Sequence, residues 1–180
     1  MKEITSGSDL QQGLHRRNFL KTLVWGGGAG LWSLTSGSRV ALGDGKADVL
    51  LLSCIDYRLV DYTVHYMVGR GLRDNYDYVI LAGASLGAIT DKYPEWNKTF
   101  WDHLGLAIRL HGIHKVIVMD HRDCGAYKLI LGENCCKPRE KETKEHRTQM
   151  QSLEKAIRKK YRDLEVELLL MDLNGVVEKI

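Results

Sequence analysis

Short runs of apolar residues alternate with stretches of helical spacing along most of the chain. Runs of this kind are typical of strands buried in a parallel sheet, and they occur at residues 48–53, 76–81, 115–119 and 166–171. Apolar positions three or four residues apart predict helices between and beyond them, at residues 59–69, 94–112, 124–131 and 140–161. Alternation of strand and helix predicts one α/β domain, a mainly parallel β-sheet flanked by helices with right-handed crossovers.

Two of these helices have clear inward faces, and the last strand has a turn signal. Pro94 suits the first turn of a helix and Gly112 its end, and the expected inward positions between them are Phe100, Leu104, Ala107, Ile108 and His111. In the last helix Met150, Leu153 and Ile157 are expected to face inward. The charged series over 137–162 then forms a solvated face. Asn174-Gly175 predicts a C-terminal hairpin.

The first 43 residues follow a different pattern. Arg16-Arg17 is followed by Asn-Phe-Leu-Lys, a glycine-rich, weakly apolar stretch and small residues around Ala41-Leu42-Gly43. This order is typical of an export signal, and the paired arginines resemble a twin-arginine signal. Its apolar part is too short for a stable membrane anchor. We therefore expect a signal peptide at 1–43, a mature domain at 44–180 and a location that is periplasmic or otherwise reached by twin-arginine export; an amphipathic N-terminal helix is the alternative.

The charge balance limits the choice of partner. The chain has 26 Lys and Arg against 23 Asp and Glu, of which five and two lie in residues 1–43, so residues 44–180 carry 21 of each sign. An electroneutral domain gives no electrostatic case for binding nucleic acid or anionic lipid. A small uncharged substrate fits this balance.

Two clusters of reactive residues follow the first and third predicted strands. Cys54, Asp56 and Arg58 come after the first strand, and His121 and Cys124 come after the third. The carboxyl ends of neighbouring parallel strands meet at one edge of the sheet, where ligands bind. Two thiolates and one imidazole leave a fourth tetrahedral position open, which is typical of catalytic Zn²⁺.

The remaining cysteine chemistry is less specific. If Cys54 were the nucleophile of a phosphatase loop, an arginine would stand six residues later, but that position is Val60. Cys135 and Cys136 lie in a predicted loop at 132–138, where we expect partial exposure or oxidation in an exported protein. A disulfide between subunits is a further alternative for this pair.

The motifs Cys-x-Asp-x-Arg and His-x-x-Cys-Gly resemble the beta class of carbonic anhydrases, in particular its compact branch. The resemblance covers about Val49 to Val177. It implies that Cys54, His121 and Cys124 bind Zn²⁺ and that Asp56 and Arg58 form a catalytic dyad beside the open position. It also implies reversible hydration of carbon dioxide to bicarbonate by a zinc-bound hydroxide, in a homodimer or higher homo-oligomer.

Two departures from that family leave the substrate open. Leu81-Ala-Gly-Ala-Ser-Leu-Gly87 replaces the usual Arg-Asn-Ala-Gly run on the substrate side, and Asp120 stands where glycine is usual. The resemblance extends to carbonyl sulfide and carbon disulfide hydrolases, which share the scaffold and ligand set of this family. Hydrolysis of either gas is therefore one alternative, and a non-catalytic zinc-binding homologue is another.

Overall fold

The computed structural model describes residues 45–180. In chain order its elements are β1 (Val49–Ser53), η1 (Tyr57–Leu59), α1 (Val60–Gly69), β2 (Tyr76–Ile80), α2 (Pro94–His111), β3 (Lys115–His121), α3 (Gly125–Leu131), η2 (Glu133–Cys136), α4 (Arg139–Lys160), β4 (Glu165–Met171) and β5 (Val177–Lys179). The predicted order of strands and helices is confirmed. The expected twin-arginine signal lies outside the described residues.

The five strands form one sheet in the order β2-β1-β3-β4-β5. The first four strands of this sheet run parallel, and β5 pairs antiparallel with β4. The predicted α/β fold with a mainly parallel sheet is confirmed, and so is the C-terminal hairpin. Gly175 in its turn has a φ of 83°, a left-handed conformation that glycine adopts without steric cost.

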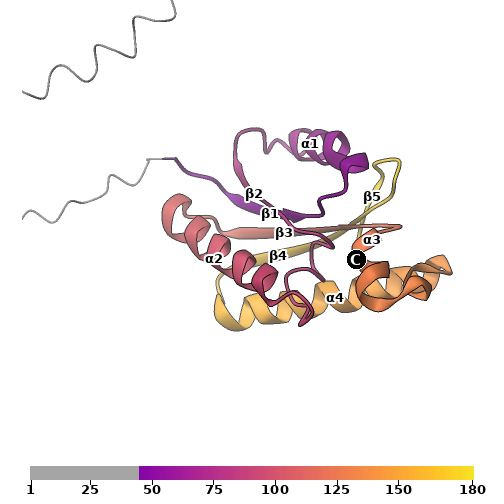
Figure 1. The fold of residues 1–180 in the computed structure, drawn as a ribbon. Coiled ribbons are helices and arrows are strands. Elements are labelled where there is room, and N and C mark those ends of the chain that lie inside the picture. The colour runs from indigo at the N-terminus through magenta and orange to yellow at the C-terminus, as the bar shows by residue number, and fades with distance from the viewer. Residues whose placement is uncertain (1–44) are drawn as a thin grey trace, which may run out of the picture. The chain divides into compact units, whose positions relative to one another are not determined.

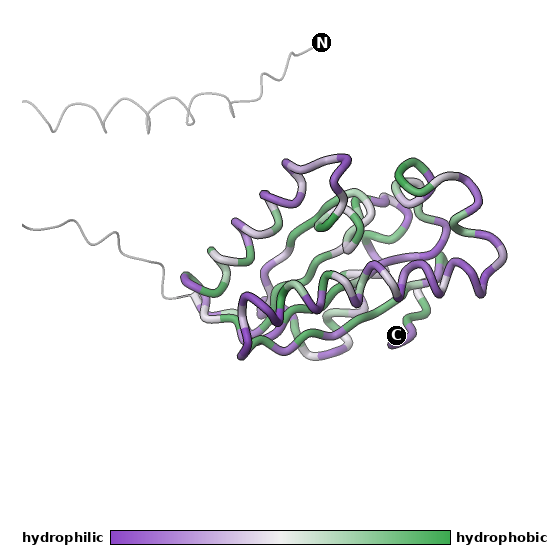
Figure 2. Tube along the Cα trace, turned by 90° about the horizontal axis from the view of Figure 1, so that it is seen from below, coloured by the Kyte–Doolittle hydropathy of each residue, from purple (hydrophilic) through white to green (hydrophobic). Residues whose placement is uncertain are grey.

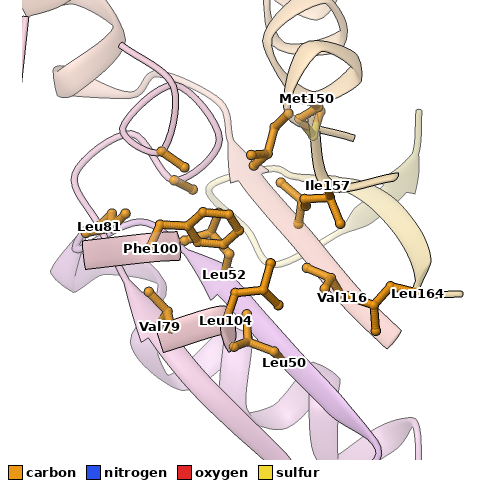
Figure 3. Close-up of a cluster of buried hydrophobic side chains, with 14 of the residues drawn as sticks. Leu50, Leu52, Val79, Leu81, Phe100, Leu104, Val116, Met150, Ile157 and Leu164 are labelled. Carbon is orange, nitrogen blue, oxygen red and sulfur yellow. The ribbon is translucent and has the colours of Figure 1, made fainter. Parts of the chain in front are cut away.

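Helices cover both faces of the sheet (Figure 1). Because side chains alternate along a strand, Leu50 and Leu52 point to the face that packs against α2 and α4, where Phe100 and Met150 are fully buried (Figure 3). Leu51 and its neighbours point to the other face, which packs against α1. Each fully buried side chain of this size stabilises the fold by about 1.5–3 kcal/mol.

The long helix α4 differs from its expected pattern. Hydrophilic residues run along most of it (Figure 2), and Met150, Leu153 and Ile157 are buried as predicted. The prediction that its charged face is solvated is wrong at Glu142, which is buried, and the neighbouring His146 is buried as well. Both lie in the first two turns of α4, where polar groups from the strand ends supply them with partners.

Three further details differ from the sequence expectations. His111 was expected in the core, but it is only partly buried, because its Nδ1 pairs with the carboxylate of Asp77 on β2 at 2.8 Å. Cys135 and Cys136 were expected to be partly exposed, but η2 buries both against Cys124 and Tyr127. Strand β3 continues to His121, two residues beyond its predicted end.

Among residues 45–180, no helix is long and apolar enough to cross a membrane.

Candidate metal centre

The predicted ligands meet where β1 and β3 end. Cys54 follows directly after β1, His121 is the last residue of β3, and Cys124 is the residue before α3. Their ligand atoms all lie within 4.8 Å of one another. The parallel register explains this convergence, because Ser53 pairs with Met119 and the two strands therefore end side by side. The structure thus brings together three residues that the sequence separates by up to 70 positions.

The ring of His121 presents a free nitrogen to this cluster. Its Nδ1 lies 2.8 Å from the carbonyl oxygen of Arg122, so Nδ1 carries the hydrogen and donates it. Nε2 is therefore the nitrogen with the lone pair. It is buried and has no hydrogen-bond partner among the described residues. An unsatisfied buried acceptor costs free energy, and a metal ion bound at Nε2 would remove this cost.

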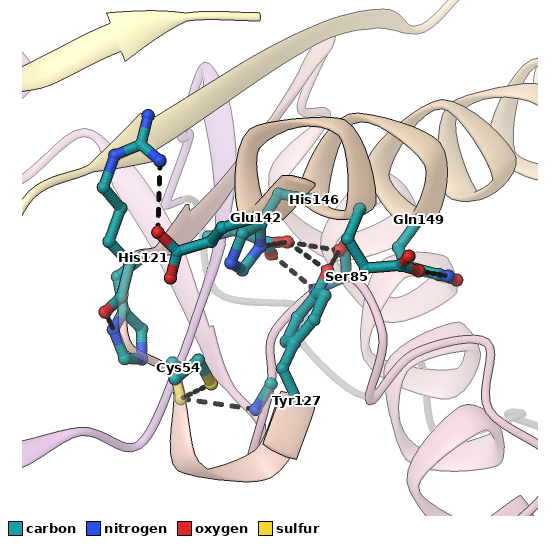
Figure 4. A network of polar contacts seen from close by, with 12 residues as sticks. Cys54, Ser85, His121, Tyr127, Glu142, His146 and Gln149 are labelled. Carbon is teal, nitrogen blue, oxygen red and sulfur yellow. Dashed lines mark hydrogen bonds and ion pairs between the residues drawn. The ribbon is translucent and has the colours of Figure 1, made fainter. Parts of the chain in front are cut away.

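The two thiols share one negative charge in the absence of a cation. Their sulfur atoms are 3.9 Å apart, and the Gly83 N–H lies 3.3 Å from the Cys54 sulfur (Figure 4). The hydrogen bond from Cys124, with a smaller contribution from the Gly83 N–H, lowers the pKa of Cys54 to about 4, although burial opposes this. The hydrogen bond to Cys54 and burial then raise the pKa of Cys124 far above its usual value. A cation is needed to hold both residues as thiolates.

This donor set fits Zn²⁺ better than a hard cation. Thiolate and imidazole ligands favour zinc over magnesium or calcium, and three protein ligands leave one tetrahedral position open. The hydrogen bond from His121 to a backbone carbonyl fixes the ring orientation, as is usual for metal-binding histidines. The residues present therefore fit a zinc ion.

Asp56 and Arg58 form a bidentate ion pair beside the cluster. Arg58 Nε lies 2.9 Å from Asp56 Oδ1, and Nη2 lies 2.7 Å from Oδ2. These hydrogen bonds, chiefly those from the guanidinium, lower the pKa of Asp56 to about 2, although its partial burial opposes this. Asp56 is therefore a carboxylate at neutral pH. Its Oδ2 lies 3.7 Å from Nε2 of His121, so the pair predicted from the sequence does border the cluster.

Sequence reasoning missed Asp123, which joins this pair to the turn between His121 and Cys124. Arg58 Nη1 donates to Asp123 Oδ2 at 3.2 Å, and Nη2 donates to its backbone carbonyl at 3.3 Å. Asp123 has a φ of 56°, and its N–H donates to Glu142 at 2.6 Å. The sequence signal that could have identified Asp123 is an aspartate in the short turn between His121 and Cys124, because Asp adopts left-handed conformations more readily than most residues.

Solved structures with a similar fold include three carbonic anhydrases. The enzyme of Streptococcus mutans matches with a TM-score of 0.51 and 16% identity, covering 76% of this chain and 82% of that one. A beta-carbonic anhydrase of Aspergillus fumigatus gives 0.51 and 16%, covering 76% of each chain. Isoform I of Trichomonas vaginalis gives 0.50 and 16%, covering 76% and 83%. The fold of this chain is that of the beta-carbonic anhydrases.

Relatives of higher sequence identity occur in Rickettsia. An uncharacterized protein of Rickettsia conorii is 44% identical over 135 residues, which is 75% of this chain and 73% of the relative. An uncharacterized protein of Rickettsia bellii is 42% identical over 135 residues, 75% of this chain and 82% of the relative. A family model described as "Putative carbonic anhydrase" matches residues 45–180, and the chain belongs to this carbonic anhydrase family.

Proposed function

We propose that this protein is a zinc-dependent carbonic anhydrase that interconverts carbon dioxide and bicarbonate. One observation carries the proposal: a cluster of the partly exposed Cys54 with the buried His121 and Cys124, in which Nε2 of His121 is free, lies beside the Asp56–Arg58 ion pair. Membership of a carbonic anhydrase family and the beta-carbonic anhydrase fold support it.

Cys54, His121 and Cys124 are the residues that would hold zinc. A zinc ion bound there would act as a Lewis acid that makes water nucleophilic near neutral pH. The two thiolates and the neutral imidazole balance the charge of the ion, so the zinc-loaded ligand set carries no net charge. An uncharged substrate then meets no electrostatic barrier at the centre.

Asp56 supplies a hydrogen-bond acceptor next to the metal position. Because its pKa is about 2, the carboxylate has no proton to donate at neutral pH and can only accept one in a hydrogen bond. It can therefore orient a water molecule so that an oxygen lone pair faces the substrate carbon. Arg58 holds the carboxylate in place through both of its oxygens, a geometry that a lysine cannot reproduce.

Three variants test the proposal on zinc-loaded full-length protein. Cys54→Ser should lose both zinc and carbon dioxide hydration. Asp56→Asn should keep zinc but lose at least about a hundredfold in activity, because the amide can turn a donor toward the water. Asp61→Asn makes the same chemical change at an exposed position of α1 and should behave as wild type. Full activity of the metal-free protein, or of Asp56→Asn, would overturn the proposal.

The altered segment from Leu81 to Gly87 is the reason to test carbonyl sulfide and carbon disulfide as alternative substrates. This segment donates the Gly83 N–H to the Cys54 sulfur, so its altered sequence lies directly at the cluster. Turnover should therefore be compared on carbon dioxide, carbonyl sulfide and carbon disulfide, with sulfide release as the readout for the last two. Zinc binding without turnover of any gas would identify a non-catalytic zinc-binding homologue.

We also propose that the protein assembles as a homodimer or higher homo-oligomer. The residues leading into α1 and the outer side of β2 expose large apolar side chains: Ile55, Tyr57, Val60 and Ile80. Strand β2 is an edge strand, and unpaired edges favour association with another strand. Light scattering should give at least twice the chain mass, and Tyr57→Glu with Val60→Glu should lower it.

Export to the periplasm by the twin-arginine route remains a proposal about residues 1–43, which the structure does not describe. A reporter that is active only after export in the folded state should require both Arg16 and Arg17. Equal export of an Arg16→Lys, Arg17→Lys double variant would contradict it.

A further inference from the structure

A second polar cluster lies behind the metal ligands, on the side that faces α4. It consists of the side chains of Ser85, Asp120, Tyr127 and His146, each at most 1% exposed (Figure 4). They come from four separate segments: the loop after β2, strand β3, helix α3 and helix α4. No step of the proposed reaction uses any of them.

Asp120 is the centre of this cluster. Its Oδ1 accepts from the Ser85 backbone N–H at 2.9 Å. Its Oδ2 accepts from the hydroxyls of Ser85 and Tyr127 at 2.7 and 2.5 Å and from Nδ1 of His146 at 2.9 Å. A buried carboxylate is costly unless hydrogen bonds compensate its lost hydration. Four donors from three segments satisfy this one, so a single side chain of β3 ties the loop after β2, helix α3 and helix α4 together.

Three of the segments that meet at Asp120 also carry part of the metal centre: β3, the loop after β2 and α3. Asp120 is peptide-bonded to His121 and points to the opposite face of the sheet, because consecutive strand residues alternate. Ser85 lies two residues after Gly83, whose N–H contacts the Cys54 sulfur. Tyr127 lies in the first turn of α3, three residues after Cys124. The network therefore connects to the segments that hold all three predicted ligands, on the side of the sheet that faces α4.

We infer that Asp120 is a positioning residue for the metal centre, which holds the Gly83 loop and the start of α3 at fixed distances from His121. This inference rests on the proposed zinc site. The geometry assigns the hydroxyls of Ser85 and Tyr127 as the two side-chain contacts through which Asp120 acts. Glycine at this position, as in the family that the sequence resembles, has no side chain to make these bonds.

Three substitutions remove different parts of the network. In Asp120→Asn the amide must turn its NH₂ toward donors on one side or the other, so at least one contact becomes repulsive. Tyr127→Phe removes one hydroxyl and keeps the ring that packs 4.0 Å from His146 between centroids. Ser85→Ala removes one hydroxyl and keeps the backbone N–H. If Asp120→Asn fails to fold, the two milder variants still decide the question.

The readouts are zinc affinity, from competition with a chelator, and the d–d absorption of the Co²⁺-loaded full chain, which reports ligand geometry. Asp120→Asn should lower zinc affinity by about 10–100-fold, the usual effect of losing a group that orients metal ligands. Tyr127→Phe and Ser85→Ala should each lower it about two- to tenfold, the equivalent of one hydrogen bond. All three should alter the cobalt spectrum. Tyr161→Phe makes the same change at the far end of α4 and should alter neither readout.

The outcomes separate this inference from the proposed function. If wild-type protein binds zinc and the three variants match its affinity and cobalt spectrum, the network is only structural and the inference is wrong. Lower unfolding free energy alone, with unchanged metal readouts, has the same meaning. If wild-type protein binds no zinc, the proposed site and this inference both fail.

Discussion

Oδ2 of Asp56 lies 3.7 Å from Nε2 of His121, while Arg58 holds the same oxygen at 2.7 Å. The carboxylate therefore stands next to the metal position but is turned toward the guanidinium. A carboxylate at this distance can become a zinc ligand after a small rotation, since zinc binds oxygen at about 2.0–2.2 Å. We therefore expect the ion pair to keep the fourth position of the proposed zinc centre open.

In the Arg58→Ala variant, Asp56 should therefore occupy the fourth coordination position while the zinc ion stays bound. Without the guanidinium, Asp56 is free to turn to zinc as a fourth ligand. Activity should fall at least about a hundredfold, while zinc stoichiometry stays at that of wild type. Cobalt absorption of the variant should show an added oxygen ligand.

Arg73→Ala is the matched control, because Arg73 is exposed and pairs with no carboxylate in the described part of the chain. It should behave as wild type. An Arg58→Ala variant with wild-type activity, or one that has lost its zinc, would show that the ion pair does not guard the fourth position.

The pKa of Asp56 makes a prediction about acid stability. Its value of about 2 in the folded protein lies below the ordinary 3.8, chiefly because Arg58 hydrogen-bonds the carboxylate. The folded state thus binds this proton less tightly than the unfolded state. The resulting stabilisation is present above about pH 4 and is lost as the pH falls toward 2. In metal-free protein, Asp56→Asn should reduce the slope of unfolding free energy against pH across this window; an unchanged slope would contradict the assignment.

Removal of the metal should make one thiol reactive. In the metal-free protein Cys54 has a pKa of about 4 and is partly exposed, whereas burial and the neighbouring thiolate keep Cys124 protonated. The thiolate is the reactive form. Iodoacetamide should therefore modify Cys54 faster than Cys124 after treatment with a chelator, and added zinc should protect it. Peptide mapping by mass spectrometry measures both rates, and a Cys54 rate that zinc does not change would argue against a shared ion.

The sequence predicted the parts of the site that lie next to strand ends. Cys54 and His121 sit at the ends of short apolar strands, and the parallel register alone brings them together. Helix α2 could be predicted equally well, because Pro94 and Gly112 mark its two ends.

The contacts made by α4 could not be predicted in the same way. Glu142 and His146 belong to a highly charged helix, and no local pattern distinguishes them from its solvated residues. Their burial depends on how α4 packs against the ends of β3 and α3, where Asp120 and the Asp123 N–H become their partners. Asp120 was noted in the sequence only as a departure from the glycine that is usual before the metal histidine, and its buried partners depend on the same packing.

Zinc-edge X-ray absorption on the zinc-loaded full chain tests the central claim most directly. The proposed centre predicts two sulfur atoms at about 2.3 Å and one imidazole nitrogen at about 2.0–2.1 Å, with one further light atom. Cys54→Ser and Cys124→Ser should each remove one sulfur, whereas Cys135→Ser and Cys136→Ser should remove none. A sulfur count that Cys54→Ser leaves unchanged, or a wild-type spectrum without two sulfurs, would contradict the assignment of the metal centre.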